Sequence, residues 1–125
     1  IIICKLAEVK EEELFRLLWD MDRVLVVIDP LPSRMLAGHK LLCRLRTSGL
    51  PVIYLINKMN GGVSRRDLLN YLKLRTPHFL PMLEPEIIYG AEYSCRLPYD
   101  LGSARTRIKK SMNGLIRELL DAQTP

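Results

Sequence analysis

The sequence predicts an α/β fold of three layers, in which a mainly parallel sheet lies between helices. The runs Val24–Ile28 and Val52–Ile56 do not alternate with polar residues. Strands of this kind need cover on both faces, which is typical of parallel sheets. Helical spacing fills the segments between them, and the order strand, helix, strand is the pattern of right-handed crossovers. We treat residues 1–125 as one domain, because this length is ordinary for a single core.

Composition excludes several classes of protein. Hydrophobic residues make up 48% and charged residues 26% of the chain, which excludes a disordered tail. The apolar runs are too short to cross a bilayer. Cys4, Cys43 and Cys95 form no C-x-x-C pair, and His39 and His78 have no ligand-type spacing, so neither a disulfide framework nor a metal site is predicted. A reducing cytoplasm fits best, and the formal charge of +5 favours an anionic partner without identifying one.

The first half of the chain gives clear element boundaries. Ile1–Ile3 is predicted as a further buried strand. A helix follows from about Val9 to Trp19, with an acidic first turn that suits the helix dipole. The next helix follows Pro32, has Ser33 as its expected N-cap, and ends at Gly49.

Two more helices are predicted in the second half. Ser64 and Asp67 form a capping pair at the start of a helix that ends before Pro77. The last helix covers Ser103–Ala122, where apolar residues recur at helical spacing.

The segment 77–99 is harder to interpret, because it holds four of the eight prolines. Proline restricts its own backbone and that of the preceding residue. Short strands are predicted at Ile87–Tyr89 and Glu92–Leu97.

Polar residues follow the predicted strands. Ligands of open parallel sheets bind beyond the carboxyl ends of the strands. We therefore expect one rim to carry the residues that end the strands, namely Asp29 and Pro30, Asn57 and Lys58, and Pro98, Tyr99 and Asp100.

The segments DRVLVVIDPLPS, GLPVIYLINKMNGG and RLPYD, in this order, resemble the C-terminal half of MinD/ParA-like ATPases, over roughly Ile1 to Leu120. The resemblance implies a partial Rossmann-like domain of the P-loop NTPase type. It implies that Asn57, with Lys58, contacts the adenine base, and that Pro98, Tyr99 and Asp100 line the other side of the base. It also implies that Asp29, Pro30 and Ser33 lie near the nucleotide and the partner subunit of a homodimer.

The sequence also departs from that family. No G-x-x-x-x-G-K-[ST] motif occurs, so this chain lacks the loop that cradles phosphates and is not expected to hydrolyse ATP alone. Cys4 stands where the family has an aspartate that orders magnesium. ATP or ADP with Mg²⁺ is therefore expected only in an intact parent protein. The start without Met also suggests that the chain is a fragment of a longer parent. No catalytic residue and no metal ligand is assigned in this chain.

Other interpretations stay open. Asn57 could simply close a turn before the two following glycines, and Asp29 to Ser33 could be only a stiff turn. The chain could be a degenerate scaffold that dimerises without nucleotide. It could also be the C-terminal half of a GTPase that reads guanine through NKMN, although Asn60 stands where a carboxylate is needed.

The resemblance also bears on partners and location. ParA-like proteins hold DNA nonspecifically through basic helices, and MinD lies on membranes. The expected role is intracellular positioning or partitioning, of a chromosome, division site, flagellum or pilus, in the cytoplasm and at the periphery of membrane or nucleoid. DNA contacts, which compete with plain solvated helix faces, are assigned to Arg65, Arg66, Arg105, Arg107, Lys109 and Lys110.

Overall fold

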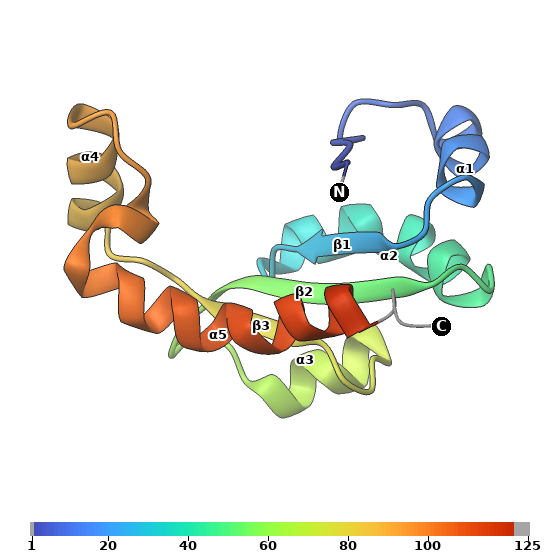
Figure 1. Cartoon of the computed structure of the whole chain (residues 1–125). Helices are drawn as coiled ribbons and strands as arrows, with labels where there is room; N and C mark the ends of the chain where they lie inside the picture. The colour runs from blue at the N-terminus through green and yellow to red at the C-terminus, as the bar shows by residue number, and fades with distance from the viewer. Residues whose placement is uncertain (1, 122–125) are drawn as a thin grey trace.

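The computed structural model of the chain describes residues 2–121 and contains a three-stranded, all-parallel sheet in the order β1-β2-β3 (Figure 1). The strands are β1 (Val24–Ile28), β2 (Val52–Met59) and β3 (His78–Pro81). β1 and β2 pair in register, with Val24 opposite Val52. The prediction of an α/β fold built on a parallel sheet is therefore confirmed.

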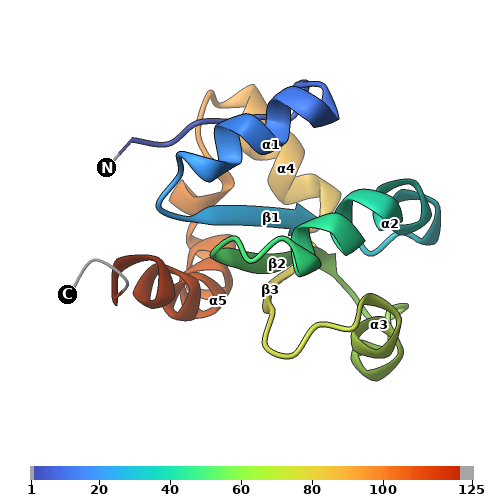
Figure 2. The same cartoon turned by 90° about the vertical axis from the view of Figure 1, so that its right-hand side faces the viewer.

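Helices cover the two faces of this sheet. Figure 2 shows α2 and α3 on one face, α5 on the other, and α1 beside the outer edge of β1. None of the described helices is both long enough and apolar enough to span a membrane. The helices are α1 (Glu11–Trp19), α2 (Pro32–Thr47), α3 (Arg65–Leu72), α4 (Pro85–Tyr93) and α5 (Gly102–Asp121), and η1 (Pro98–Asp100) is a 3₁₀ turn.

The central strand β2 explains the lack of polar alternation in its sequence. Ile56 is fully buried and packs with Leu42 of α2 on one face of the sheet. Ile53 and Leu55 point to the other face and pack with Leu115 of α5. Both faces of β2 are therefore covered, which requires apolar residues at consecutive positions.

The edge strand β1 is covered on one face only. Val24 is buried against Leu18 of α1 and Leu45 of α2. Leu25 and Val27 alternate onto the other face, where they are 40% and 57% exposed. An apolar strip of β1 therefore faces solvent beside α5.

The strand predicted at Ile1–Ile3 is wrong for its described part. Ile2 and Ile3 have no regular structure and are highly exposed, because β1 is an edge strand that pairs only with β2. Ile1 lies outside the described residues. Apolar, strand-forming residues alone do not make a strand without a neighbouring strand to pair with.

The two short strands predicted between residues 87 and 97 are also wrong. Residues 85–93 form α4, with Pro85 at its first positions and Glu86 in its first turn, which are favourable at helix starts. The third strand is β3 instead, which ends in Pro81. Proline is tolerated there because β3 is an edge strand.

Two helix starts were predicted from capping residues, with different outcomes. Ser64 caps α3, and its Oγ accepts the Asp67 N–H at 3.3 Å, as predicted. Ser33 is not an N-cap, because α2 starts at Pro32 with Leu31 as the cap, two residues before the predicted one. The predicted end of the last helix, Ala122, lies outside the described residues.

Candidate functional site

A β-bulge marks the carboxyl end of β2. Ile56 lies opposite Phe79 but Met59 lies opposite Pro81, so β2 holds one extra residue between these pairs. Lys58 has a φ of 57°, a left-handed conformation that costs about 1–2 kcal/mol for a residue with a Cβ. Bulges of this kind are frequent next to binding sites, where they redirect side chains.

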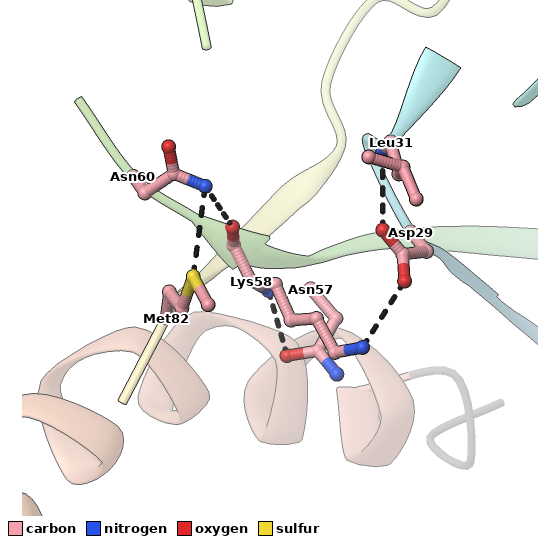
Figure 3. Close-up of polar contacts among 6 residues, drawn as sticks. All are labelled: Asp29, Leu31, Asn57, Lys58, Asn60 and Met82. Carbon is pink, nitrogen blue, oxygen red and sulfur yellow. Dashed lines mark hydrogen bonds and ion pairs between the residues drawn. The ribbon is translucent and has the colours of Figure 1, made fainter. Parts of the chain in front are cut away.

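The Asn57 side chain is half-buried at this bulge. Its Oδ1 accepts the Lys58 N–H at 2.9 Å (Figure 3). An amide oxygen has a second lone pair, and Nδ2 can donate two hydrogens. Among the described residues no hydrogen bond uses Nδ2, so its two hydrogens and one lone pair of Oδ1 remain available to a ligand.

An ion pair joins the carboxyl ends of β1 and β2. Lys58 Nζ lies 3.1 Å from Asp29 Oδ2, and Asp29 Oδ1 accepts the Leu31 N–H at 3.0 Å (Figure 3). The Leu31 hydrogen bond and then the Lys58 contact lower the pKa of the Asp29 carboxyl. Asp29 is therefore ionised at neutral pH and fixes the lysine that follows Asn57.

Asn60 closes the turn after β2. Its Nδ2 donates to the Lys58 carbonyl at 3.0 Å (Figure 3), and its Oδ1 accepts the Gly62 N–H at 2.9 Å. A Cβ on Gly62 would come within 3.1 Å of that oxygen. Both ends of the Asn60 amide are therefore used within its own turn.

The turn η1 links α4 to α5, so the expectation that Pro98, Tyr99 and Asp100 follow a strand is wrong. Asp100 Oδ2 accepts the Leu97 N–H at 3.3 Å, and Arg96 donates to the Asp100 carbonyl at 2.9 Å. The guanidinium carbon of Arg105 lies over the Tyr99 ring, 5.5 Å from the centroid of that ring. η1 packs against α5 and α4, and no hydrogen bond or ion pair within residues 2–121 joins it to Asp29 or Asn57.

The turn after β1 splits into a buried and an exposed part. Pro30 is buried, whereas Ser33 is exposed. Only Ser33 and the partly exposed Asp29 are accessible for the subunit contact that the resemblance implies.

The six basic residues do not form one patch. Arg65, Arg107 and Lys110 line a common pocket between α3, β3 and α5. Arg105 stacks on η1, and the exposed Arg66 and Lys109 lie outside the pocket lining. No sequence motif signals this pocket, because its residues come from distant segments.

The donor atoms fit a base better than a magnesium ion. Mg²⁺ prefers several oxygen ligands, whereas the Asp29 carboxylate is occupied by Lys58 and the Leu31 N–H. Within the part of the chain that the structure describes, no three His, Cys, Asp or Glu side chains cluster as a metal site. Cys4, which the proposed resemblance aligns with an aspartate of the family, is exposed.

No protein-family model, curated protein or solved structure matches this chain. The resemblance to MinD/ParA-like ATPases therefore stays a hypothesis based on the motifs and on the site geometry.

Proposed function

We propose that this chain is the base-binding and subunit-contact half of a MinD/ParA-like ATPase that acts in intracellular positioning or partitioning. The observation that supports this most is the bulge at Asn57 and Lys58, at the carboxyl end of a central parallel strand. Ligands of such sheets bind at this edge. We also propose that the fold is a three-layer Rossmann-like domain of the P-loop NTPase type.

Asn57 supplies the chemistry for recognising adenine. A single asparagine amide can donate to the ring nitrogen N7 of adenine and accept from the N6 amino group of the base in a paired contact. Lys58 forms an ion pair with Asp29, and its aliphatic stem would lie against the bound base. Pro98, Tyr99 and Asp100 would close the far side of the base only if η1 moved toward β2 or the base extended to it.

Phosphate and magnesium chemistry would come from the rest of the parent protein. The chain has no phosphate loop, and its rim offers no free set of oxygen ligands. The proposed role of this half is therefore to bind ATP or ADP through the base and to contact a second subunit through Asp29 and Ser33.

The test is calorimetric titration of the chain with ADP, comparing wild type, Asn57→Ala and the control Asn113→Ala. Asn113 is exposed on α5, far in sequence from the rim. We expect weak binding that Asn57→Ala reduces about tenfold, since a paired base contact is worth about 1–3 kcal/mol, and that Asn113→Ala leaves unchanged. Absence of ADP binding, or equal losses in both variants, would reject base recognition.

A dimerising scaffold without nucleotide is the second candidate. The exposed apolar face of β1, at Leu25 and Val27, favours it, because apolar strips on sheets are usually covered. Self-association of the chain without nucleotide, measured by sedimentation, together with no response to ADP, would favour the scaffold.

The guanine hypothesis is weaker on geometry. The Asn60 amide is hydrogen-bonded within its own turn and would present a donor where guanine requires an acceptor. Tighter binding of GDP than of ADP in the same titration would revive the GTPase interpretation.

DNA or membrane-surface contact stays a proposal for the basic helices. DNA binding through phosphates would weaken steeply with salt. Failure of the chain to retain duplex DNA at low ionic strength would reject it. The amphipathic face of α5 instead packs on the sheet through Leu115, which disfavours a role for that face as a membrane anchor.

A further inference from the structure

A pocket of about 660 Å³ opens along the outer edge of β3. Its volume falls within the range of small-molecule sites, roughly 300–1,000 Å³. α3 forms one wall, α5 the other, and β3 lies between them. The lining residues are Met59, Asn60, Val63, Arg65, Pro77, His78, Phe79, Pro81, Arg107, Lys110 and Ser111.

The lining is cationic. It contains three basic side chains and no carboxylate. Arg107 is already engaged by Glu84, with hydrogen bonds of 3.0 and 2.6 Å. Arg65 and Lys110 have no carboxylate partner among the described residues, and they come from opposite walls. Both side chains therefore line the same open space.

The Arg65 side chain stacks on the ring of Phe79. Its guanidinium carbon lies 4.4 Å from the centroid of the Phe79 ring. Stacking on an aromatic face orients the planar group while its N–H edges remain free. Met59, Val63 and Pro81 add apolar surface to the lining. The pocket thus offers an oriented cation next to an apolar floor.

The outer edge of β3 is poorly suited to an added strand. Pro77 precedes β3 and Pro81 ends it, and proline has no N–H to donate to a ladder. Prolines on edge strands prevent pairing with another chain. A ligand here must be held by side chains rather than by the backbone of β3.

We propose that the β3-edge pocket binds a small ligand that carries a phosphate group on an apolar or aromatic body. Arg65 would grip two phosphate oxygens with its fork, and Lys110 would add a point charge from the opposite wall. The Ser111 hydroxyl, in the same lining, can donate to a third oxygen. The apolar body would lie against Phe79 and Pro81. This site does not depend on the proposed base-binding rim.

The probe is phenyl phosphate, titrated into the full chain by calorimetry at low salt. The chain provides two matched pairs of variants, since Lys110 and Arg65 line the pocket whereas their neighbours Lys109 and Arg66 do not. We expect Lys110→Ala and Arg65→Ala each to weaken binding about tenfold, as expected for a charge-assisted hydrogen bond. Lys109→Ala and Arg66→Ala should change it less than about twofold. Circular dichroism verifies that all four variants fold.

Four outcomes would overturn the proposal. The first is no detectable binding of phenyl phosphate at millimolar concentration. The second is equal weakening by both members of each pair, which indicates only general electrostatic attraction. The third is equal affinity for benzoate, which indicates that the pocket does not select phosphate. Binding of a short DNA duplex through Arg65 and Lys110, without binding of phenyl phosphate, would also count against it. Asn57→Ala should leave phenyl phosphate binding intact, so failure here is distinguishable from failure of base recognition.

Discussion

The rim at the carboxyl ends of β1 and β2 differs from the pocket at the outer edge of β3 in where its residues lie in the sequence. Asp29 follows β1 directly, and Asn57 and Lys58 lie within the last residues of β2. Strand ends are local in sequence, and parallel pairing brings them together. The pocket instead takes Arg65 from α3 and Lys110 from α5.

The two regions also differ in charge. At the rim, Lys58 is neutralised by Asp29 at 3.1 Å, so an amide remains as the available polar group. In the pocket, two cations remain without an acidic partner in the described chain. The rim is therefore suited to a neutral planar group such as a base, and the pocket to an anion.

Ile56 is the position on which both regions depend. It precedes Asn57, lies opposite Phe79, and is fully buried. We predict that Ile56→Ala lowers the free energy of unfolding by about 2–5 kcal/mol, because it leaves a cavity in the core. Urea denaturation followed by circular dichroism measures this effect.

Val27→Ala is the control for that experiment. Val27 lies in the neighbouring strand but is 57% exposed, so its loss should cost less than about 1 kcal/mol. Similar costs for the two variants would contradict the assignment of β2 as the covered strand and β1 as the half-bare one.

The same contrast shows how far the sequence alone could go. The parallel sheet, β1, β2 and the polar strand ends follow from apolar runs and their order. The residues Asp29 and Lys58 could be placed at one rim, but the bulge and the ion pair could not. They depend on the register shift against β3, and β3 is a four-residue strand bounded by prolines that gives no period-2 signal.

The errors have a common physical cause. Ile2 and Ile3 have strand propensity but no pairing partner, and Ile87 to Tyr89 are strand formers placed inside a helix by Pro85 and Glu86. Tertiary context overrode local propensity in both segments. The β3-edge pocket was not predictable for a related reason, since it exists only once α3 and α5 pack on opposite faces of the sheet.

Backbone strain offers a way to measure how much the rim ion pair contributes. Lys58 and Lys73 both have left-handed backbones, with φ of 57° and 52°, but within residues 2–121 only Lys58 of the two has an acidic partner. We predict that Lys73→Gly stabilises the protein by about 0.5–1 kcal/mol, since removal of the Cβ penalty outweighs the opposing entropy that glycine adds to the unfolded chain. Lys58→Gly should gain less, because it also loses the pair with Asp29, worth at most about 1 kcal/mol.

Thermal unfolding of the two glycine variants, side by side, measures this difference. An equal gain in both would show that the Asp29 pair adds no stability. The bulge alone, without the ion pair, would then determine the positions of the rim residues.

The smallest predicted effect concerns the pKa values of two carboxyl groups, Asp29 at the rim and Glu84 beside the pocket. The pKa of Asp29 is lowered from its ordinary value of 3.8, first by the Leu31 N–H and then by Lys58. The pKa of Glu84 is lowered from 4.5, first by the hydrogen bond from Arg107. Both groups therefore contribute stability above these ordinary values, and the contribution is lost as pH falls through the lowered pKa values.

Salt should separate them, because ions screen a surface ion pair more than a backbone hydrogen bond. We predict that raising the ionic strength to about 1 M moves the pKa of Glu84 back toward its ordinary value while that of Asp29 stays depressed. NMR titration of the two carboxyl groups at low and high salt measures both shifts. A return of the Asp29 pKa to its ordinary value at high salt would contradict this prediction. It would mean that the ion pair with Lys58, and not the hydrogen bond from the Leu31 N–H, lowers the pKa of Asp29.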